Sequence, residues 1–368
     1  MTVKRLMLVW VMMLCMMLIC GVARAVEWEQ YAVEEGTRLL ARFEHEGKNT
    51  VTLTREYDLV WERDGEVLGR LLRRDYPGLW LNTVAVPLSD GRCAVVISDL
   101  PLHPGELESY SVDFGLWSPE GLVLIAQWSG NGCRAVCCDQ GVLVTFVTNE
   151  AHLYTLEGEL LWSGSVGEGT FCRAQGLQML NAEDWVCSLI DYSGDDNTRR
   201  AYARVTHGER VWLRDTAHYS RLSALPDGRS VMAEYRNDGQ YGPVILTLLD
   251  DAGRTLVTRR VEGDRLITDA VAPLTAEDGS LVVYGTAVAN SRHVYQVWRL
   301  TIRPDLSFES LEVRNAAYHG DYSLAYRVFP NDLSCWLTLR AHDGSDAPTV
   351  VVPYDALPVV TNHTLRYE

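Results

Sequence analysis

Two series of tight turns recur along the chain, and they restrict the possible folds more than any other feature of the sequence. The first series lies near Gly36, Gly91, Gly141, Glu183, Gly228, Gly279 and Asp332. The second lies near Gly65, Gly121, Gly158, Gly208, Gly253, Asp305 and Ala356. Successive turns of the first series are about 42 to 55 residues apart, and each series has seven members. The chain is therefore expected to repeat one structural unit seven times.

The clearest copy of this unit spans residues 219–262. Short runs of alternating apolar and polar residues in it predict four strands. These strands are expected at Arg221–Leu225, Ser230–Tyr235, Val244–Leu249 and Thr255–Val261. Gly228 and Gly253 stand in the turns after the first and third strands, where glycine adopts a positive φ without steric cost. The same order of strands and turns recurs in the other units, and capped helical patterns are nearly absent.

A four-stranded sheet cannot bury both of its faces alone, whereas sheets stacked around an axis bury them against each other. The repeat therefore predicts an all-β fold, a seven-bladed β-propeller of four-stranded antiparallel blades. We expect residues 26–368 to form this single β-propeller domain. The first and last units each contain four predicted strands, so no exchange of strands between the two ends is expected. A pair of β-sandwich domains is the alternative fold.

Five tryptophans fall close to the turns of the second series. They are Trp61, Trp117, Trp162, Trp212 and Trp298. Large rings at these positions can pack between adjacent blades, because each ring buries a large apolar area. We predict a structural role for them, with stacking against a ligand as the alternative for some.

One unit shows its turn sequence with particular clarity. Residues 153–162 read Leu-Tyr-Thr-Leu-Glu-Gly-Glu-Leu-Leu-Trp, a strand, an acidic-glycine turn and a second strand that ends in tryptophan. This segment resembles repeats of the quinoprotein-like and WD40-like propeller superfamily. The resemblance implies the architecture and no specific family, since the other units lack the Trp-Asp dipeptide and none has a sialidase-type Asp box. It also suggests a quinone-dependent dehydrogenase, but no cofactor motif accompanies it.

The first 25 residues have the three parts of a secretory signal peptide. Lys4 and Arg5 supply the positive region, Leu6–Val22 is an apolar run without charge, and residues 23–25 (Ala-Arg-Ala) place small residues at the cleavage site. We therefore predict a signal peptide over residues 1–25 and a secreted or cell-envelope location for the rest of the chain. The alternative is an uncleaved anchor, for which this run is at the short limit.

The charge of the chain limits its partners. The formal net charge is −16, and removal of the three positive charges in residues 1–25 makes it −19. Nucleic acids and anionic membrane surfaces require a basic footprint, so neither is an expected partner. Apart from the N-terminal run, the sequence contains no stretch long and apolar enough to span a membrane. A protein, a peptide or a glycan is the expected kind of partner.

Seven cysteines follow the predicted signal peptide: Cys93, Cys133, Cys137, Cys138, Cys172, Cys187 and Cys335. Export permits disulfides, but an odd number leaves at least one thiol unpaired. Several of these cysteines lie within apolar strand patterns, so buried thiols are predicted. No metal site is predicted, because Cys133, Cys137 and Cys138 have no second ligand pair nearby.

The order of strands assigns the connections to two faces of the propeller. The tight turns lie on one face, and the longer loops lie on the opposite face, which we call the long-loop face. Loops on rigid scaffolds frequently carry function, and this face is rich in aromatic and acidic residues suited to a sugar or a cationic peptide. The predicted ligand-binding residues are Tyr76, Trp80, Tyr192, Asp195, Asp196, Tyr235, Asp238, Tyr241, His319 and Tyr322. Long loops that are merely tolerated insertions are the alternative interpretation.

Motifs of catalysis are missing from the sequence. It contains no HExxH, GxSxG or P-loop motif, and no catalytic residue is predicted. Residues 195–197 (Asp-Asp-Asn) could ligate Ca²⁺, but a solvated acidic loop is favoured. The sequence thus predicts an exported, non-catalytic binding propeller with an unknown cofactor requirement. The alternative is a carbohydrate-active enzyme that uses two carboxylates near the propeller axis.

Overall fold

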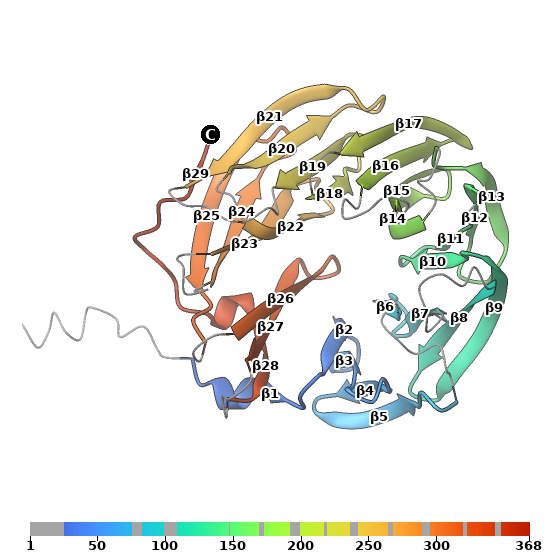
Figure 1. Cartoon of the computed structure of the whole chain (residues 1–368), viewed down its shortest axis with the longest axis horizontal. Helices are drawn as coiled ribbons and strands as arrows, with labels where there is room; N and C mark the ends of the chain where they lie inside the picture. Colours follow the sequence, from blue (N-terminus) through green and yellow to red (C-terminus); the bar gives the residue numbers. More distant parts are fainter. Residues whose placement is uncertain are drawn as a thin grey trace, which may run out of the picture.

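The computed structural model describes residues 26–75, 83–98, 109–146, 148–168, 173–191, 199–216, 219–235, 242–263, 268–288, 295–318, 322–342 and 347–368. In these ranges the chain forms seven antiparallel sheets arranged as blades around one axis (Figure 1). The fold is therefore the predicted all-β, seven-bladed propeller. Two short 3₁₀ helices, η1 (Trp28–Tyr31) and η2 (Tyr354–Ala356), accompany the strands.

Within each of blades 1 to 6, the strand nearest the axis comes first in the sequence (Figure 1). Blade 1 contains β2 (Arg38–Glu44), β3 (Lys48–Leu53), β4 (Leu59–Arg63) and β5 (Glu66–Leu71). Blade 2 contains β6 (Val84–Pro87), β7 (Cys93–Ser98), β8 (Ser109–Ser118) and β9 (Gly121–Asn131). Blade 3 contains β10 (Arg134–Cys137), β11 (Val142–Thr145), β12 (Glu150–Tyr154) and β13 (Leu160–Ser165).

The next three blades follow the same order. Blade 4 contains β14 (Arg173–Asn181), β15 (Asp184–Asp191), β16 (Arg199–Thr206) and β17 (Glu209–Thr216). Blade 5 contains β18 (Tyr219–Ala224), β19 (Ser230–Tyr235), β20 (Val244–Leu249) and β21 (Thr255–Glu262). Blade 6 contains β22 (Thr268–Thr275), β23 (Leu281–Val288), β24 (Tyr295–Ile302) and β25 (Phe308–Asn315). The strands predicted in residues 219–262 are thus confirmed, with differences of at most two residues at their ends.

Blade 7 is built from both ends of the chain, which corrects the expectation that the first and last units are each complete. Its inner strands are β26 (Tyr322–Phe329), β27 (Ser334–Ala341) and β28 (Thr349–Pro353), and its outer strand is β1 (Ala32–Val33). Ala32 pairs with Val350 in this sheet. A strand of two residues is too short to show an alternating pattern, so the sequence contained no visible sign of it.

Two of the turns predicted from the repeat are therefore wrong. Gly36 joins β1 of blade 7 to β2 of blade 1, so it connects two blades instead of two strands of one blade. Ala356 ends η2, and the chain then runs away from blade 7. The other twelve turn positions lie between consecutive strands of one blade, as expected.

The last residues run along the outside of the ring and join it at two further blades. The backbone N–H of Val360 donates to the carbonyl of Val313 in blade 6 at 2.8 Å. Strand β29 (Arg366–Tyr367) then pairs with β21 as a fifth strand of blade 5. The Tyr367 hydroxyl donates to the Leu306 carbonyl at 2.6 Å, and its ring stacks on Phe308 with centroids 5.8 Å apart. Figure 1 shows this C-terminal segment beside β25 and β21.

The predicted packing of tryptophans between blades is confirmed. Trp61 and Trp117 are almost fully buried and meet edge to face across the interface of blades 1 and 2, with centroids 5.3 Å apart. Trp162 of blade 3 meets Trp185 of blade 4 in the same way at 5.2 Å. Trp298 has no exposed surface and belongs to the core shared by blades 5 and 6. The rings act as wedges that fill the space between neighbouring sheets.

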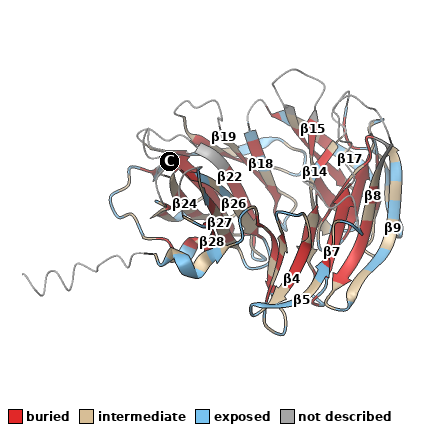
Figure 2. Cartoon of the chain, turned by 60° about the horizontal axis from the view of Figure 1, so that its bottom comes forward, coloured by how far each residue is buried: buried red, intermediate tan, exposed pale blue. Residues whose placement is uncertain are grey.

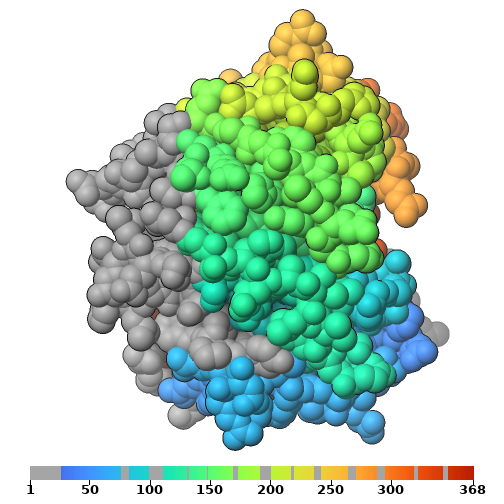
Figure 3. Space-filling model, turned by 90° about the vertical axis from the view of Figure 1, so that its right-hand side faces the viewer, coloured from blue at the N-terminus to red at the C-terminus, as the bar shows by residue number. Residues whose placement is uncertain are grey.

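Buried residues concentrate on the second and third strands of the blades, and the outer strands are more exposed, as the contrast between β7 and β9 shows (Figure 2). The outer strands of blades 1 to 6 each have an exposed apolar side chain near their first residue. These side chains are Val67, Val123, Leu160, Val211, Leu256 and Phe308. Figure 3 shows the flank of the molecule, on which segments coloured blue, green and yellow follow one another in sequence order.

The interfaces between consecutive blades differ in one place. Apolar clusters join blades 1 and 2, 2 and 3, 3 and 4, 4 and 5, 5 and 6, and 6 and 7. In the part of the chain that the structure describes, none of these clusters joins blade 7 to blade 1. We call this last interface the seam, because the ring closes there.

The cysteines of the described residues carry unpaired thiols. Cys93, Cys133, Cys137, Cys187 and Cys335 are buried, as predicted, and Cys138 is half-buried. Burial raises the pKa of the Cys187 thiol to about 12, so this thiol stays protonated near neutral pH. Cys172 lies outside the described residues. Within the described ranges, no helix has the length and apolar character needed to cross a bilayer.

Candidate functional site

The structure tests the predicted binding residues only in part. Two of them lie in described ranges, at the long-loop end of their strands: Tyr235 at the end of β19 and Tyr322 at the start of β26. The other eight lie outside the described residues: Tyr76, Trp80, Tyr192, Asp195, Asp196, Asp238, Tyr241 and His319. Their role in ligand binding stays a prediction.

Both described tyrosines are packed inside the protein. Tyr235 is 8% exposed within the core of blades 5 and 6, and its ring lies 5.8 Å from that of Tyr219. Tyr322 is 2% exposed in the core of blades 6 and 7, and its hydroxyl donates to the Ala316 carbonyl. These contacts show how both rings serve the packing of blades, and ligand contact by either ring stays a prediction.

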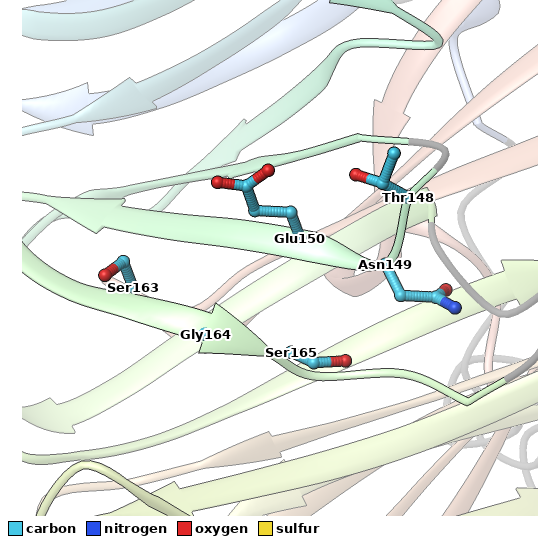
Figure 4. Close-up of a pocket in the computed structure, with 6 residues that line it drawn as sticks. All are labelled: Thr148, Asn149, Glu150, Ser163, Gly164 and Ser165. Atoms are coloured by element: carbon cyan, nitrogen blue, oxygen red, sulfur yellow. The ribbon is translucent and has the colours of Figure 1, made fainter.

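One depression lies at the long-loop end of blade 3, between β12 and β13. It has a volume of about 380 Å³ and is lined by Thr148, Asn149, Glu150, Ser163, Gly164 and Ser165. Figure 4 shows these residues on β12, on β13 and in the turn that precedes β12. The Glu150 carboxylate is engaged by the His152 ring at 2.8 Å. The depression is widely open and contains a single charged group, so it provides little to orient a ligand.

A second pocket lies at the seam, where β2 and β26 run side by side at the axis (Figure 1). Its volume is about 390 Å³. It is lined by residues 37–39 of blade 1, by residues 323–327 of β26, and by Trp336, Thr338 and Arg340 of β27. We call it the seam pocket. Because residues 37–39 and 323 stand where β2 and β26 begin, the pocket lies toward the long-loop face.

The pairing of β26 with β27 explains which side chains share this pocket. Ser323 lies opposite Arg340, Ala325 opposite Thr338, and Arg327 opposite Trp336. Directly paired residues of an antiparallel sheet point to the same side, and alternate residues along a strand do as well. These six residues thus form one face of blade 7, which meets blade 1. The opposite face, with Tyr322 and Leu337, packs on blade 6.

Three guanidinium groups line the seam pocket. Among the described residues, Arg38, Arg327 and Arg340 have no ion pair with a carboxylate, and no acidic residue lines the pocket. Burial, followed by the positive charge of Arg38, lowers the pKa of the Arg327 guanidinium to about 10. Like charges brought together in a partly buried place disfavour the charged form of each. The pocket is therefore a local concentration of positive charge in an acidic chain.

The remaining walls of the pocket add one further donor and several apolar surfaces. The indole Nε1 of Trp336 is buried and has no acceptor among the described residues. Its ring is covered by the Arg42 guanidinium, 4.4 Å from the ring centre, and Arg42 also pairs with Asp332 at 3.6 Å. Leu39 also lines the pocket, as do Leu324 and Tyr326, whose side chains pack against the core of blades 6 and 7 on the opposite face of β26. The arrangement can donate several hydrogen bonds to a negatively charged group beside an apolar wall.

Sequence reasoning missed these arginines, although a signal for them was present. A strand whose two faces both pack tightly against neighbouring blades should have apolar residues in both alternating sets. In β26, one set of alternating residues is apolar and consists of Leu324, Tyr326 and Val328. The other set consists of Ser323, Ala325 and Arg327, which are small or polar. A polar side on an innermost strand marks a place where the neighbouring blade leaves room.

The alternative function, a carbohydrate-active enzyme, requires two carboxylates near the propeller axis, so the charged residues of the innermost strands are relevant to it. The seven strands nearest the axis (β2, β6, β10, β14, β18, β22 and β26) contain six arginines and two acidic residues, Glu44 and Asp269. Within these described strands arginines thus outnumber acidic residues, whereas acidic residues predominate in the chain as a whole.

Comparison with known proteins supports the class of the fold. No family model matches the sequence, and no curated protein matches it either. Among solved structures, a chain from "Crystal Structure of Mitotic Checkpoint Complex" matches with a TM-score of 0.50 and 12% identity, over 89% of this chain and 97% of that one. BamB from Moraxella catarrhalis matches with a TM-score of 0.41 and 11% identity, over 88% and 99% of the two chains.

A third similar structure is the Dos1 propeller, with a TM-score of 0.48 and 11% identity, over 86% of this chain and 77% of that one. At these identities the similarity concerns the fold alone. The protein is a seven-bladed β-propeller. The fold is shared by many proteins with different functions, so function is argued from the seam pocket.

Proposed function

We propose that this protein is an exported, non-catalytic binding propeller that holds its ligand at the long-loop face, with the seam pocket as the point of insertion. The observation that carries this proposal is the pocket itself, a concave site with three arginines that lack carboxylate partners among the described residues. Its volume of about 390 Å³ falls in the range of ligand sites. A protein, a peptide or a glycan remains the expected kind of ligand.

The position of the pocket supports this function. The three strands that form its walls, β2, β26 and β27, belong to blades 1 and 7, so the side chains are held on a rigid scaffold. Ser323 and Ala325 are exposed at the pocket, which leaves it open to an approaching ligand. A carbohydrate-active enzyme is less well supported, because the inner strands offer mainly arginines.

Blocking the pocket is expected to abolish binding. In the Ala325→Trp variant, the indole would fill the seam pocket, and we expect ligands found by screening peptide and glycan libraries to lose measurable affinity. The matched control is Leu256→Trp, on an outer strand where residue 256 is 51% exposed. Surface plasmon resonance on both variants, with circular dichroism to verify folding, provides the measurement. Ligands that bind Ala325→Trp as well as they bind the natural chain would refute this site.

Export is expected to depend on the first 25 residues. Fused to a phosphatase that is active only outside the cytoplasm, residues 1–25 should direct the enzyme across the membrane of a bacterial host. Replacing two apolar residues of the run, Leu8→Arg and Val11→Arg, should prevent this, because the translocated segment must be apolar. Mass spectrometry of the exported chain should show Val26 as the first residue. Phosphatase activity that is equal with and without residues 1–25 would contradict export.

A further inference from the structure

We propose that the seam pocket binds a small organic oxyanion, a carboxylate or a phosphate attached to an apolar body, and that this ligand joins blade 7 to blade 1. The inference rests on the proposed binding function and adds the chemistry of what is bound. It follows from three observations: the donors in the pocket, the lack of an apolar cluster at the seam, and the apolar wall beside the arginines.

The donors are matched to an oxyanion. Guanidinium groups present paired N–H donors in a planar arrangement that fits carboxylates and phosphates. Arg38 comes from blade 1, while Arg327 and Arg340 come from two strands of blade 7, so a single anion can be approached from both sides of the seam. Trp336 belongs to the same lining, and its indole N–H is buried without an acceptor among the described residues. A buried donor without an acceptor is costly, and an oxyanion would supply acceptors for it.

The seam lacks the packing that holds the other interfaces together. Each of the other six contains an apolar cluster, whereas none of the described clusters crosses from blade 7 to blade 1. At the tight-turn end, Arg42 pairs with Asp332, and Asn331 donates to the Arg42 carbonyl at 3.2 Å. Toward the long-loop face, Arg38 and Arg327 instead repel each other. A bound anion would convert this repulsion into attraction on both sides.

The walls indicate that the anion carries an apolar part. Leu39 of blade 1 and the ring of Trp336 of blade 7 line the pocket beside the arginines, whereas the side chains of Leu324 and Tyr326 pack against the core of blades 6 and 7. Aromatic and aliphatic surfaces of this kind bury an apolar group, while the few polar groups fix its orientation. An inorganic ion would leave these walls in contact with water. The pocket volume of about 390 Å³ suits a compact organic molecule or one side group of a larger ligand.

The test uses the full chain and four simple probes: benzoate, phenyl phosphate, benzamide and inorganic phosphate. We expect benzoate or phenyl phosphate to raise the Tm in a saturable way, because a ligand that binds only the folded state stabilises it. The preference between these two identifies the oxyanion. Benzamide has the shape of benzoate without its charge, so it should bind at least about tenfold more weakly. Inorganic phosphate should also bind more weakly than phenyl phosphate.

Variants locate the effect. Arg327→Met and Arg38→Gln should each weaken anion binding, measured by calorimetric titration, by at least about tenfold, because each removes a charged donor. The control is Arg259→Gln, an exposed arginine on β21 that should leave the affinity unchanged. The inference is overturned if neither organic anion binds, if benzamide binds equally well, or if the pocket variants behave like the control. Equal binding of inorganic and phenyl phosphate would overturn the requirement for an apolar body.

The two proposals fail in different ways. If Ala325→Trp abolishes binding of a screened ligand while Arg327→Met and Arg38→Gln leave it intact, the pocket is the binding site and the oxyanion is wrong. If the anions bind and respond to the arginine variants while Ala325→Trp leaves the screened ligand unaffected, the oxyanion site stands and the proposed function at this pocket is wrong.

Discussion

Replacement of Asp184 by alanine is expected to destabilise the protein by about 3–5 kcal/mol, because it leaves the buried charge of Arg204 without a partner. The Arg204 side chain is 2% exposed. It donates to Asp184 through Nε at 2.9 Å and through Nη2 at 2.5 Å, and it also donates to the Gly228 carbonyl in blade 5. The pair thus joins blade 4 to blade 5, where the shared apolar cluster is small.

A double variant distinguishes the effect of leaving Arg204 without its charged partner from the effect of lost packing. In Asp184→Leu with Arg204→Met, both charges are replaced by apolar side chains, and most of the lost stability should return, since a buried ion pair can be exchanged for apolar groups at little cost. Urea unfolding of the single and double variants, followed by tryptophan fluorescence, provides the comparison. If the double variant is no more stable than Asp184→Ala, the large effect does not come from the uncompensated charge.

Replacement of Trp61 by alanine is expected to cost about 3–5 kcal/mol, because it opens a cavity in the core of blades 1 and 2. Trp61 has no exposed surface, and its ring meets those of Phe43 and Trp117 at centroid distances of 5.6 and 5.3 Å. Its Nε1 also donates to the Asn49 side chain at 2.9 Å. The substitution removes the wedge between two blades together with this hydrogen bond.

The loss of stability in Trp61→Ala is compared with that of a substitution at an exposed position. Leu256 is 51% exposed on an outer strand, so Leu256→Ala should change the unfolding free energy by less than about 0.5 kcal/mol. Trp61→Phe should fall between the two, since a smaller ring keeps part of the packing and loses the N–H. A Trp61→Ala variant as stable as Leu256→Ala would show that the blades hold together without this wedge.

Local sequence patterns were sufficient to predict the blades. Strands such as β19 and β20 coincide with the ranges expected from alternation, because each is bounded by turn residues and buries apolar side chains. The tryptophans could be placed between blades because only that space accommodates such large buried rings. The closing strand β1 and the added strand β29 could not be predicted, since two residues carry no periodic signal.

The sequence predicted a binding site on the long-loop face, toward which the seam pocket lies, but it did not predict the residues that line this pocket. Two of the predicted binding residues, Tyr235 and Tyr322, turned out to pack between blades, and eight lie outside the described residues. Arg38 and Arg327 are separated by most of the chain, so no local motif relates them. They come together only because the ring closes at the seam and brings the first complete blade against the last.

The sequence by itself determined the number of blades, the four-stranded unit and the positions of twelve of the fourteen predicted turns, because turns and strands depend on residues close together in the chain. Only the tertiary structure decided how the ring closes, where the C-terminal segment attaches and which charges meet at the axis. These features depend on contacts between residues far apart in sequence, and a repeat that specifies each blade separately does not specify how the last blade meets the first.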